Sequence, residues 1–133
     1  MILDSSSIIA VVRSEPESRM FLQIIDSAAH CRLSAVNYVE TAIVVDSVRD
    51  PVLSRELDDF LRDSGVSIQP VTTSQAYIAR QAYRDFGKGS GHPARLNFGD
   101  CFAYALAKEC GEPLLFKGED FMHTDVTPAS ARG

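Results

Sequence analysis

The chain has 133 residues and a mass of 14.6 kDa, which fits a single domain over residues 1–133 with one hydrophobic core. Its mean hydropathy of -0.04, the lack of any apolar run near ~20 residues and the lack of a secretory signal predict a cytoplasmic protein without a membrane segment. The net charge of -5 at pH 7 excludes a protein that binds nucleic acid through a uniformly basic surface.

The first half of the chain predicts two short strands and three helices. Met1 to Asp4 is an apolar run that ends in an acid, and the serines after it suit a strand-to-helix junction. Pro16 fits the first turn of an amphipathic helix, and Asn37 is a typical N-cap residue for the next helix. The expected elements are a strand at 1–4, a helix at 16–29, a strand at 32–35 and helices at 37–49 and 51–65.

The second half predicts two strands and two helices around a glycine-rich loop. Gly65 and Gly111 each end a helix, and each precedes a short apolar strand. The expected elements are a strand at 66–71, a helix that includes 76–86, a loop at 87–93, a helix at 97–110 and a strand at 113–116. Because strands and helices alternate, we predict an α/β domain with a mainly parallel central sheet flanked by helices.

Four acidic residues stand at the ends of separate predicted elements. Asp4 and Asp120 follow strands, whereas Glu40 and Asp100 lie in the first turns of helices. In open α/β sheets, ligands bind at the carboxyl ends of the strands, so these acids are expected to meet there. Clustered carboxylates repel one another, and a divalent cation that prefers oxygen ligands would relieve that repulsion. We therefore take all four acids as candidate metal ligands and catalytic residues.

Each acid also has a purely structural explanation. Glu40 and Asp100 each stand three residues after an asparagine, which is the spacing of an N-cap and an acid in the first helical turn. Asp4 can cap the helix after the serines, and Asp120 can close a turn. Capping remains open for each acid alone, but the joint placement of four acids favours a metal site.

Other metal and nucleotide sites have less support. The three cysteines contain no C-x-x-C pair and the three histidines lack helical spacing, so neither a disulfide framework nor a zinc site is expected. Residues 87–91, Gly-Lys-Gly-Ser-Gly, lack the residue order of a phosphate-binding P-loop and a strand before it. We expect a flexible loop there.

Positive charge is concentrated in one region. Residues 80–117 carry six Lys or Arg against four Asp or Glu, a net charge of +2, while the rest of the chain carries -7. Such a region can bind nucleic-acid phosphates, although an ordinary mixture of solvated surface charges explains it equally well. The candidate phosphate contacts are Arg80, Arg84, Lys88, Arg95 and Lys117.

Four short motifs together resemble the PIN-domain VapC toxins over nearly the whole chain. They are Leu3-Asp4-Ser5-Ser6, Tyr38-Val39-Glu40, Leu96-Asn97-Phe98-Gly99-Asp100-Cys101 and Leu114-Leu115-Phe116-Lys117-Gly118-Glu119-Asp120-Phe121. The resemblance implies a homodimeric α/β/α toxin of a type II toxin-antitoxin system, neutralised by a cognate antitoxin. It also implies an endoribonuclease that hydrolyses RNA with Mg²⁺, or Mn²⁺ in its place, held by three or four acids.

Most of the family's site residues can be carried over to this chain. Asp4, Glu40 and Asp100 match directly, but Gly118 stands where many relatives have an acid, so Asp120, or alternatively Glu119, supplies the fourth carboxylate. The resemblance also suggests that the hydroxyl of Ser6 lies beside the metal and that Asn97 supports the site; both residues suit helix caps equally well.

Two rival functions remain at this point. A phosphatase with an aspartyl nucleophile is one, but Asp4-Ser5-Ser6 lacks the second acid of that pattern. The other is a PIN-like binding module that retains the fold without cleaving RNA, or one whose acids only cap helices. Apolar segments at 21–25 and 43–48 are expected to be buried in the core; if one small core does not cover them, they leave a surface for a dimer or for an antitoxin helix.

Overall fold

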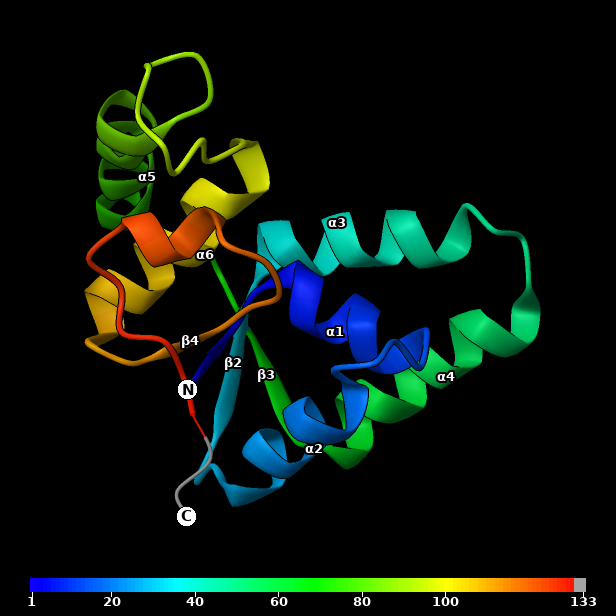
Figure 1. The fold of residues 1–133 in the computed structure, drawn as a ribbon. Coiled ribbons are helices and arrows are strands. Elements are labelled where there is room, and N and C mark those ends of the chain that lie inside the picture. Colours follow the sequence, from blue (N-terminus) through cyan, green and yellow to red (C-terminus); the bar gives the residue numbers. More distant parts are fainter. Residues whose placement is uncertain (131–133) are drawn as a thin grey trace.

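The computed structural model describes residues 1–130, and its centre is a four-stranded sheet in the order β3-β2-β1-β4 (Figure 1). Its strands are β1 (Ile2–Leu3), β2 (Cys31–Ser34), β3 (Val66–Gln69) and β4 (Leu114–Leu115). Every pairing is parallel, with Ile2 opposite Arg32 in β2 and Leu114 in β4. The predicted α/β fold with a parallel sheet is therefore confirmed.

Helices cover both faces of this sheet. Successive strand residues point to opposite faces, so each strand contributes side chains to two cores. Ile2 and Leu114 belong to the core under two helices, α5 (Thr73–Phe86) and α6 (Phe98–Cys110). Leu3 and Leu115 belong to the core on the other face, which is covered by four helices: α1 (Ser5–Val12), α2 (Ser18–Ser27), α3 (Ala35–Asp46) and α4 (Pro51–Asp63). Figure 1 shows α3 and α4 joined into a pair that extends beyond the sheet. The result is an α/β/α sandwich.

The start of α3 differs from the prediction that Asn37 caps this helix. The N-cap is Ser34, whose Oγ accepts a hydrogen bond from the backbone N–H of Val36 at 3.3 Å, so the helix begins at Ala35. Asn37 therefore lies inside the helix, and Glu40 lies in its second turn, not its first. The capping explanation for Glu40 is wrong.

Several other boundaries also differ by small amounts, and one further short helix is present. The second helix begins at Ser18, not Pro16, because residues before it form a turn. The strand from Val66 ends at Gln69, since Pro70 has no N–H to continue the ladder. A short 3-10 helix, η1 (Asp120–His123), follows β4 where only a turn was expected. No helix within residues 1–130 is both long and apolar enough to cross a membrane.

Candidate functional site

The four predicted acids lie near one another at the carboxyl ends of the strands. Asp4 follows β1, Glu40 is on α3, Asp100 is in the first turn of α6 and Asp120 begins η1. Burial, together with the charges of Asp4, Asp120 and Glu40, raises the pKa of Asp100 to about 7, and the hydrogen bond from the Asn97 backbone opposes this increase. The carboxylates therefore share one electrostatic environment, although they come from four separate elements.

Asp4 is the most deeply buried of the four, at 3% exposure. Its Oδ2 accepts hydrogen bonds from the Ser6 backbone N–H at 3.0 Å and the Ser6 hydroxyl at 2.5 Å, so Asp4 caps α1. Its Oδ1 is buried without a hydrogen-bond partner. Burial raises the pKa of Asp4 to about 6, while the Ser6 hydrogen bonds oppose this increase. One oxygen of Asp4 is thus committed to the fold and the other is free.

Glu40 is held by residues that sequence reasoning did not select as part of the site. Ser5 donates its hydroxyl to Glu40 Oε1 at 2.5 Å, and Asn37 Nδ2 lies 3.4 Å from the same oxygen. The carboxylate also lies against the backbone of Gly99, where an added Cβ would be 2.0 Å from Glu40 Oε2. The only signal in the sequence is adjacency: Asn37 is one helical turn before Glu40, and Gly99 directly precedes Asp100.

Asp100 both caps α6 and faces the other acids. The backbone N–H of Asp100 donates to Asn97 Oδ1 at 2.9 Å, and the backbone N–H of Asn97 donates to Asp100 Oδ2 at 3.1 Å. This is a reciprocal capping box, so the structural explanation is correct for this residue. It uses only Oδ2 of the carboxylate, and the functional explanation therefore remains open.

Asp120 is the exposed member of the group. It begins η1, and its N-cap, Glu119, makes no side-chain cap hydrogen bond. Of these two neighbouring acids, Asp120 is the one whose charge affects Asp100. Ser6 connects this segment to Asp4, because its Oγ accepts the Lys117 backbone N–H at 2.9 Å while donating to Asp4.

The chemistry of these side chains fits a hard divalent cation. All the donors are carboxylate oxygens, the buried Asp4 Oδ1 lacks a partner, and the repulsion among the acids would be relieved by positive charge. Within residues 1–130, however, no three His, Cys, Asp or Glu side chains are already arranged to hold a metal ion. Binding would therefore require the carboxylates to move closer together.

The basic residues predicted to contact phosphates fall into two groups. Arg80, Arg84, Lys88 and Arg95 are exposed, and none of them forms an ion pair within the described part of the chain. Lys117 Nζ instead contacts Glu15 at 2.6 Å and Glu17 at 3.1 Å. The first four are available to phosphates, whereas the charge of Lys117 is already balanced.

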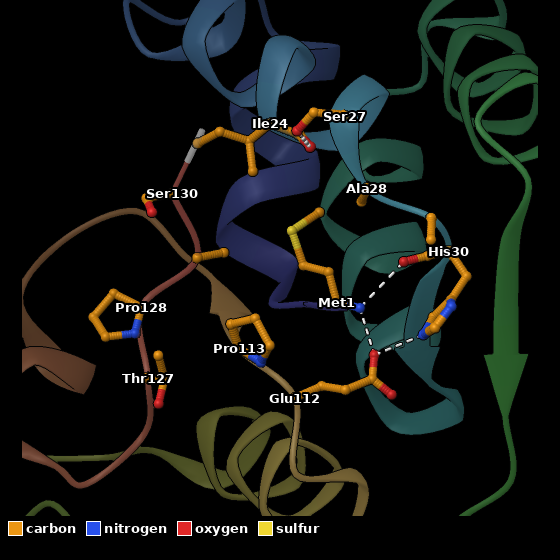
Figure 2. A pocket seen from close by; sticks show the side chains of 12 residues that line it. Met1, Ile24, Ser27, Ala28, His30, Glu112, Pro113, Thr127, Pro128 and Ser130 are labelled. Atoms are coloured by element: carbon orange, nitrogen blue, oxygen red, sulfur yellow. Dashed lines mark hydrogen bonds and ion pairs between the residues drawn. The ribbon is translucent and has the colours of Figure 1, made fainter. Parts of the chain in front are cut away.

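A cavity of about 570 Å³ lies at the opposite end of the sheet, before the strands begin (Figure 2). There the Met1 amino group donates to the His30 carbonyl at 3.1 Å and also contacts Glu112, and His30 Nε2 lies 2.9 Å from the same carboxylate. None of the four acids lines this cavity. It is separate from the candidate metal site.

Comparison with known proteins identifies the family. The PIN domain family model matches residues 1–126. Ribonuclease VapC28 of Mycobacterium tuberculosis is 52% identical over 132 residues, covering 99% of each chain. Ribonuclease VapC42 of the same species is 47% identical over 129 residues, covering 97% of this chain and 98% of the relative.

Solved structures agree in fold. The crystal structure of Mycobacterium tuberculosis VapC20, described as a Sarcin-Ricin loop cleaving toxin, has a TM-score of 0.74 at 13% identity and covers 97% of this chain and 98% of its own. The FitAcB structure from Neisseria gonorrhoeae has a TM-score of 0.69 at 21% identity, with 98% of each chain covered. The chain therefore belongs to the PIN domain family, in its group of VapC ribonucleases.

Proposed function

We propose that this chain is the toxin of a type II toxin-antitoxin system, a cytoplasmic endoribonuclease whose Asp4, Glu40, Asp100 and Asp120 bind Mg²⁺, with Mn²⁺ as a substitute. The observation that carries the proposal is the placement of the four acids at the carboxyl ends of the strands, where burial and then the charges of the other three carboxylates raise the pKa of Asp100. Ribonuclease relatives at about half identity over nearly the whole chain support the activity.

The chemistry follows from the arrangement of the carboxylates. A bound Mg²⁺ would supply a Lewis acid that draws charge from the phosphate. Asp4 and Asp100 are the firmest candidate ligands, since each has one carboxylate oxygen that the fold does not use. Water attacks phosphorus and the P–O bond to the leaving ribose oxygen breaks; a carboxylate not fully engaged with the cation accepts the proton of the attacking water, and the leaving oxygen takes up a proton from solvent water. No side chain acts as a nucleophile.

RNA would reach the acidic site through the exposed cations. Arg80, Arg84, Lys88 and Arg95 lie on α5 and the segment leading to α6, and their unpaired charges offset repulsion between RNA phosphates and the carboxylates. Single-stranded loops are the expected substrate class, because their splayed backbone enters a small site more easily than a duplex does.

An apolar face beside the acids supports a homodimer. Val39 and Ile43 on α3 are 53% and 63% exposed, Phe98 on α6 is 71% exposed, and these three side chains line a hollow together with Glu40. Apolar side chains gathered this way typically mark an interaction surface. A second copy packed on this face would bring two acid clusters close together. A cognate antitoxin is the other proposed partner, and blocking the acids would neutralise the toxin.

The alternative is an inert PIN-like binding module. The absence, within residues 1–130, of three potential ligands in a metal-holding arrangement favours it.

Induced expression in a bacterium without the antitoxin separates the two functions. We expect wild-type protein to arrest growth and cut cellular RNA, and Asp100→Asn to do neither, while Asp26→Asn, at an exposed position on α2, behaves as wild type. Equal growth with wild-type and Asp100→Asn proteins would favour the inert module.

A further inference from the structure

Asn37 is a fully buried amide within α3, with an exposure of 0%. Its Nδ2 donates to the backbone carbonyl of Gly99 at 3.0 Å and lies 3.4 Å from Glu40 Oε1. Gly99 is in the first turn of α6, directly before Asp100. One amide group therefore connects the helix that carries Glu40 with the helix turn that carries Asp100.

The surroundings of Asn37 leave the Glu40 carboxylate little freedom. Ser5 Oγ contacts both Glu40 Oε1 at 2.5 Å and the Asn37 carbonyl at 3.2 Å. On the opposite side the bare backbone of Gly99 leaves only enough room for Glu40 Oε2. The carboxylate is thus confined by α1, α3 and α6 together.

The stability of the fold does not explain why an amide side chain is buried at position 37. Its Oδ1 is buried without a partner, and an unsatisfied buried acceptor is less favourable than an aliphatic group of similar size. The backbone carbonyl of Asn37, by contrast, accepts a hydrogen bond from the Thr41 hydroxyl at 2.7 Å, one turn along α3. What the amide adds over an aliphatic side chain is the pair of contacts to Gly99 and Glu40.

We propose that Asn37 is a positioning residue, which holds Glu40 and the first turn of α6 in the register that lets Glu40 and Asp100 bind the same cation. This inference rests on the proposed metal-dependent function. Because the carboxylates must move closer together to hold a cation, a fixed register between α3 and α6 limits how far they have to move.

The test is titration of Mn²⁺ into purified full-length protein, followed by electron paramagnetic resonance, with thermal unfolding measured in parallel. Asn37→Leu should keep its unfolding temperature or raise it, yet bind Mn²⁺ at least about tenfold more weakly. Excess Mn²⁺ should restore part of the RNA cleavage. Thr41→Val is the matched control, since Thr41 is equally buried on the same helix and its hydroxyl donates to the Asn37 backbone carbonyl, not to a carboxylate; its Mn²⁺ affinity should equal that of wild type.

The outcomes separate the two claims. A folded Asn37→Leu protein with wild-type Mn²⁺ affinity would overturn the positioning role and leave the metal site intact. Wild-type protein that binds no Mn²⁺ would overturn the proposed metal-dependent function itself, and with it this inference. If Asn37→Leu does not fold, Asn37→Ser takes its place, because serine is small, polar and too short to reach Gly99.

Discussion

At Gly99 a hydrogen atom in place of a methyl group decides whether Glu40 can lie against helix α6. Alanine is more favourable than glycine inside a helix by about 1 kcal/mol, so helix propensity alone predicts that Gly99→Ala stabilises the protein. The new Cβ would lie 2.0 Å from Glu40 Oε2, however, and the carboxylate would have to move.

We therefore expect Gly99→Ala to reduce RNA cleavage at least about tenfold while changing the unfolding temperature by less than about 5 °C. Cleavage kinetics and a thermal melt of the same preparation check this. Glu109→Ala, at the exposed end of α6, is the control and should cleave normally. Full activity in Gly99→Ala would show that Glu40 does not need its present position.

The raised pKa values of Asp4 and Asp100, about 6 and about 7, predict how stability depends on pH. Between pH 5 and 8 the folded chain binds more protons than the unfolded chain, so metal-free protein becomes less stable as pH rises. Mg²⁺ replaces those protons and should stabilise more at pH 8 than at pH 5.5. Melts in EDTA and in Mg²⁺ at both values test this; a Mg²⁺ effect independent of pH would contradict it.

Sequence reasoning predicted the four acids as one site because it expected each of them at the end of an element, where parallel strands bring residues together. It missed Ser5, Asn37 and Gly99 as parts of the site. Their roles depend on how closely α1, α3 and α6 approach one another, and that distance is set by tertiary packing. A glycine needed for space, at an ordinary helical φ, carries no local signal of its own.

The segment after β4 carries Asp120, and Lys117 in this segment contacts the start of α1 and the residues ahead of α2 through a hydrogen bond and two ion pairs. The Lys117 backbone N–H donates to Ser6 Oγ, and its Nζ contacts Glu15 and Glu17 ahead of α2. Exposed ion pairs contribute only about 0–1 kcal/mol each, so this contact affects global stability little. Its expected effect is local, on where Asp120 lies.

Lys117→Met should lower cleavage several-fold with little change in unfolding temperature, and should leave the salt dependence of RNA binding unchanged. Arg84→Ala should instead reduce that salt dependence, because RNA binding with one phosphate contact fewer releases fewer counterions. Lys108→Met, which removes the pair with Asp125, is the control for loss of a surface ion pair. A reduced salt slope in Lys117→Met would mean that Lys117 contacts RNA after all.

Helices and strands were largely predictable because turn residues and apolar periodicity act locally. Gly111, for example, adopts a left-handed φ of 63° at the end of α6, as expected for a helix-ending glycine. The start of α3 was not predictable in this way, since Ser34 and Asn37 are both good N-cap residues. The choice between them depends on where β2 ends and on the buried contact that Asn37 makes with Gly99.

For the whole molecule, the apolar face of Val39, Ile43 and Phe98 predicts self-association. We expect wild-type protein to be a dimer by light scattering after size-exclusion chromatography. Ile43→Glu should be monomeric, because a charge in an apolar interface is not compensated. Val52→Glu on α4 is the matched control, with a side chain of similar type and 61% exposure, and should stay dimeric. A monomeric wild type would contradict this prediction.

The uneven charge of the molecule, with an acidic site and exposed cations on α5 and on the segment leading to α6, makes sense if a cation and RNA meet at the site. The most direct test is cleavage of a mixed RNA pool by purified, antitoxin-free protein in Mg²⁺, Mn²⁺ or EDTA, with Asp4→Asn and Asp100→Asn alongside. The account predicts cutting with either metal, none in EDTA, and losses of at least about 100-fold in both variants. Cutting that persists in EDTA or in both variants would contradict it.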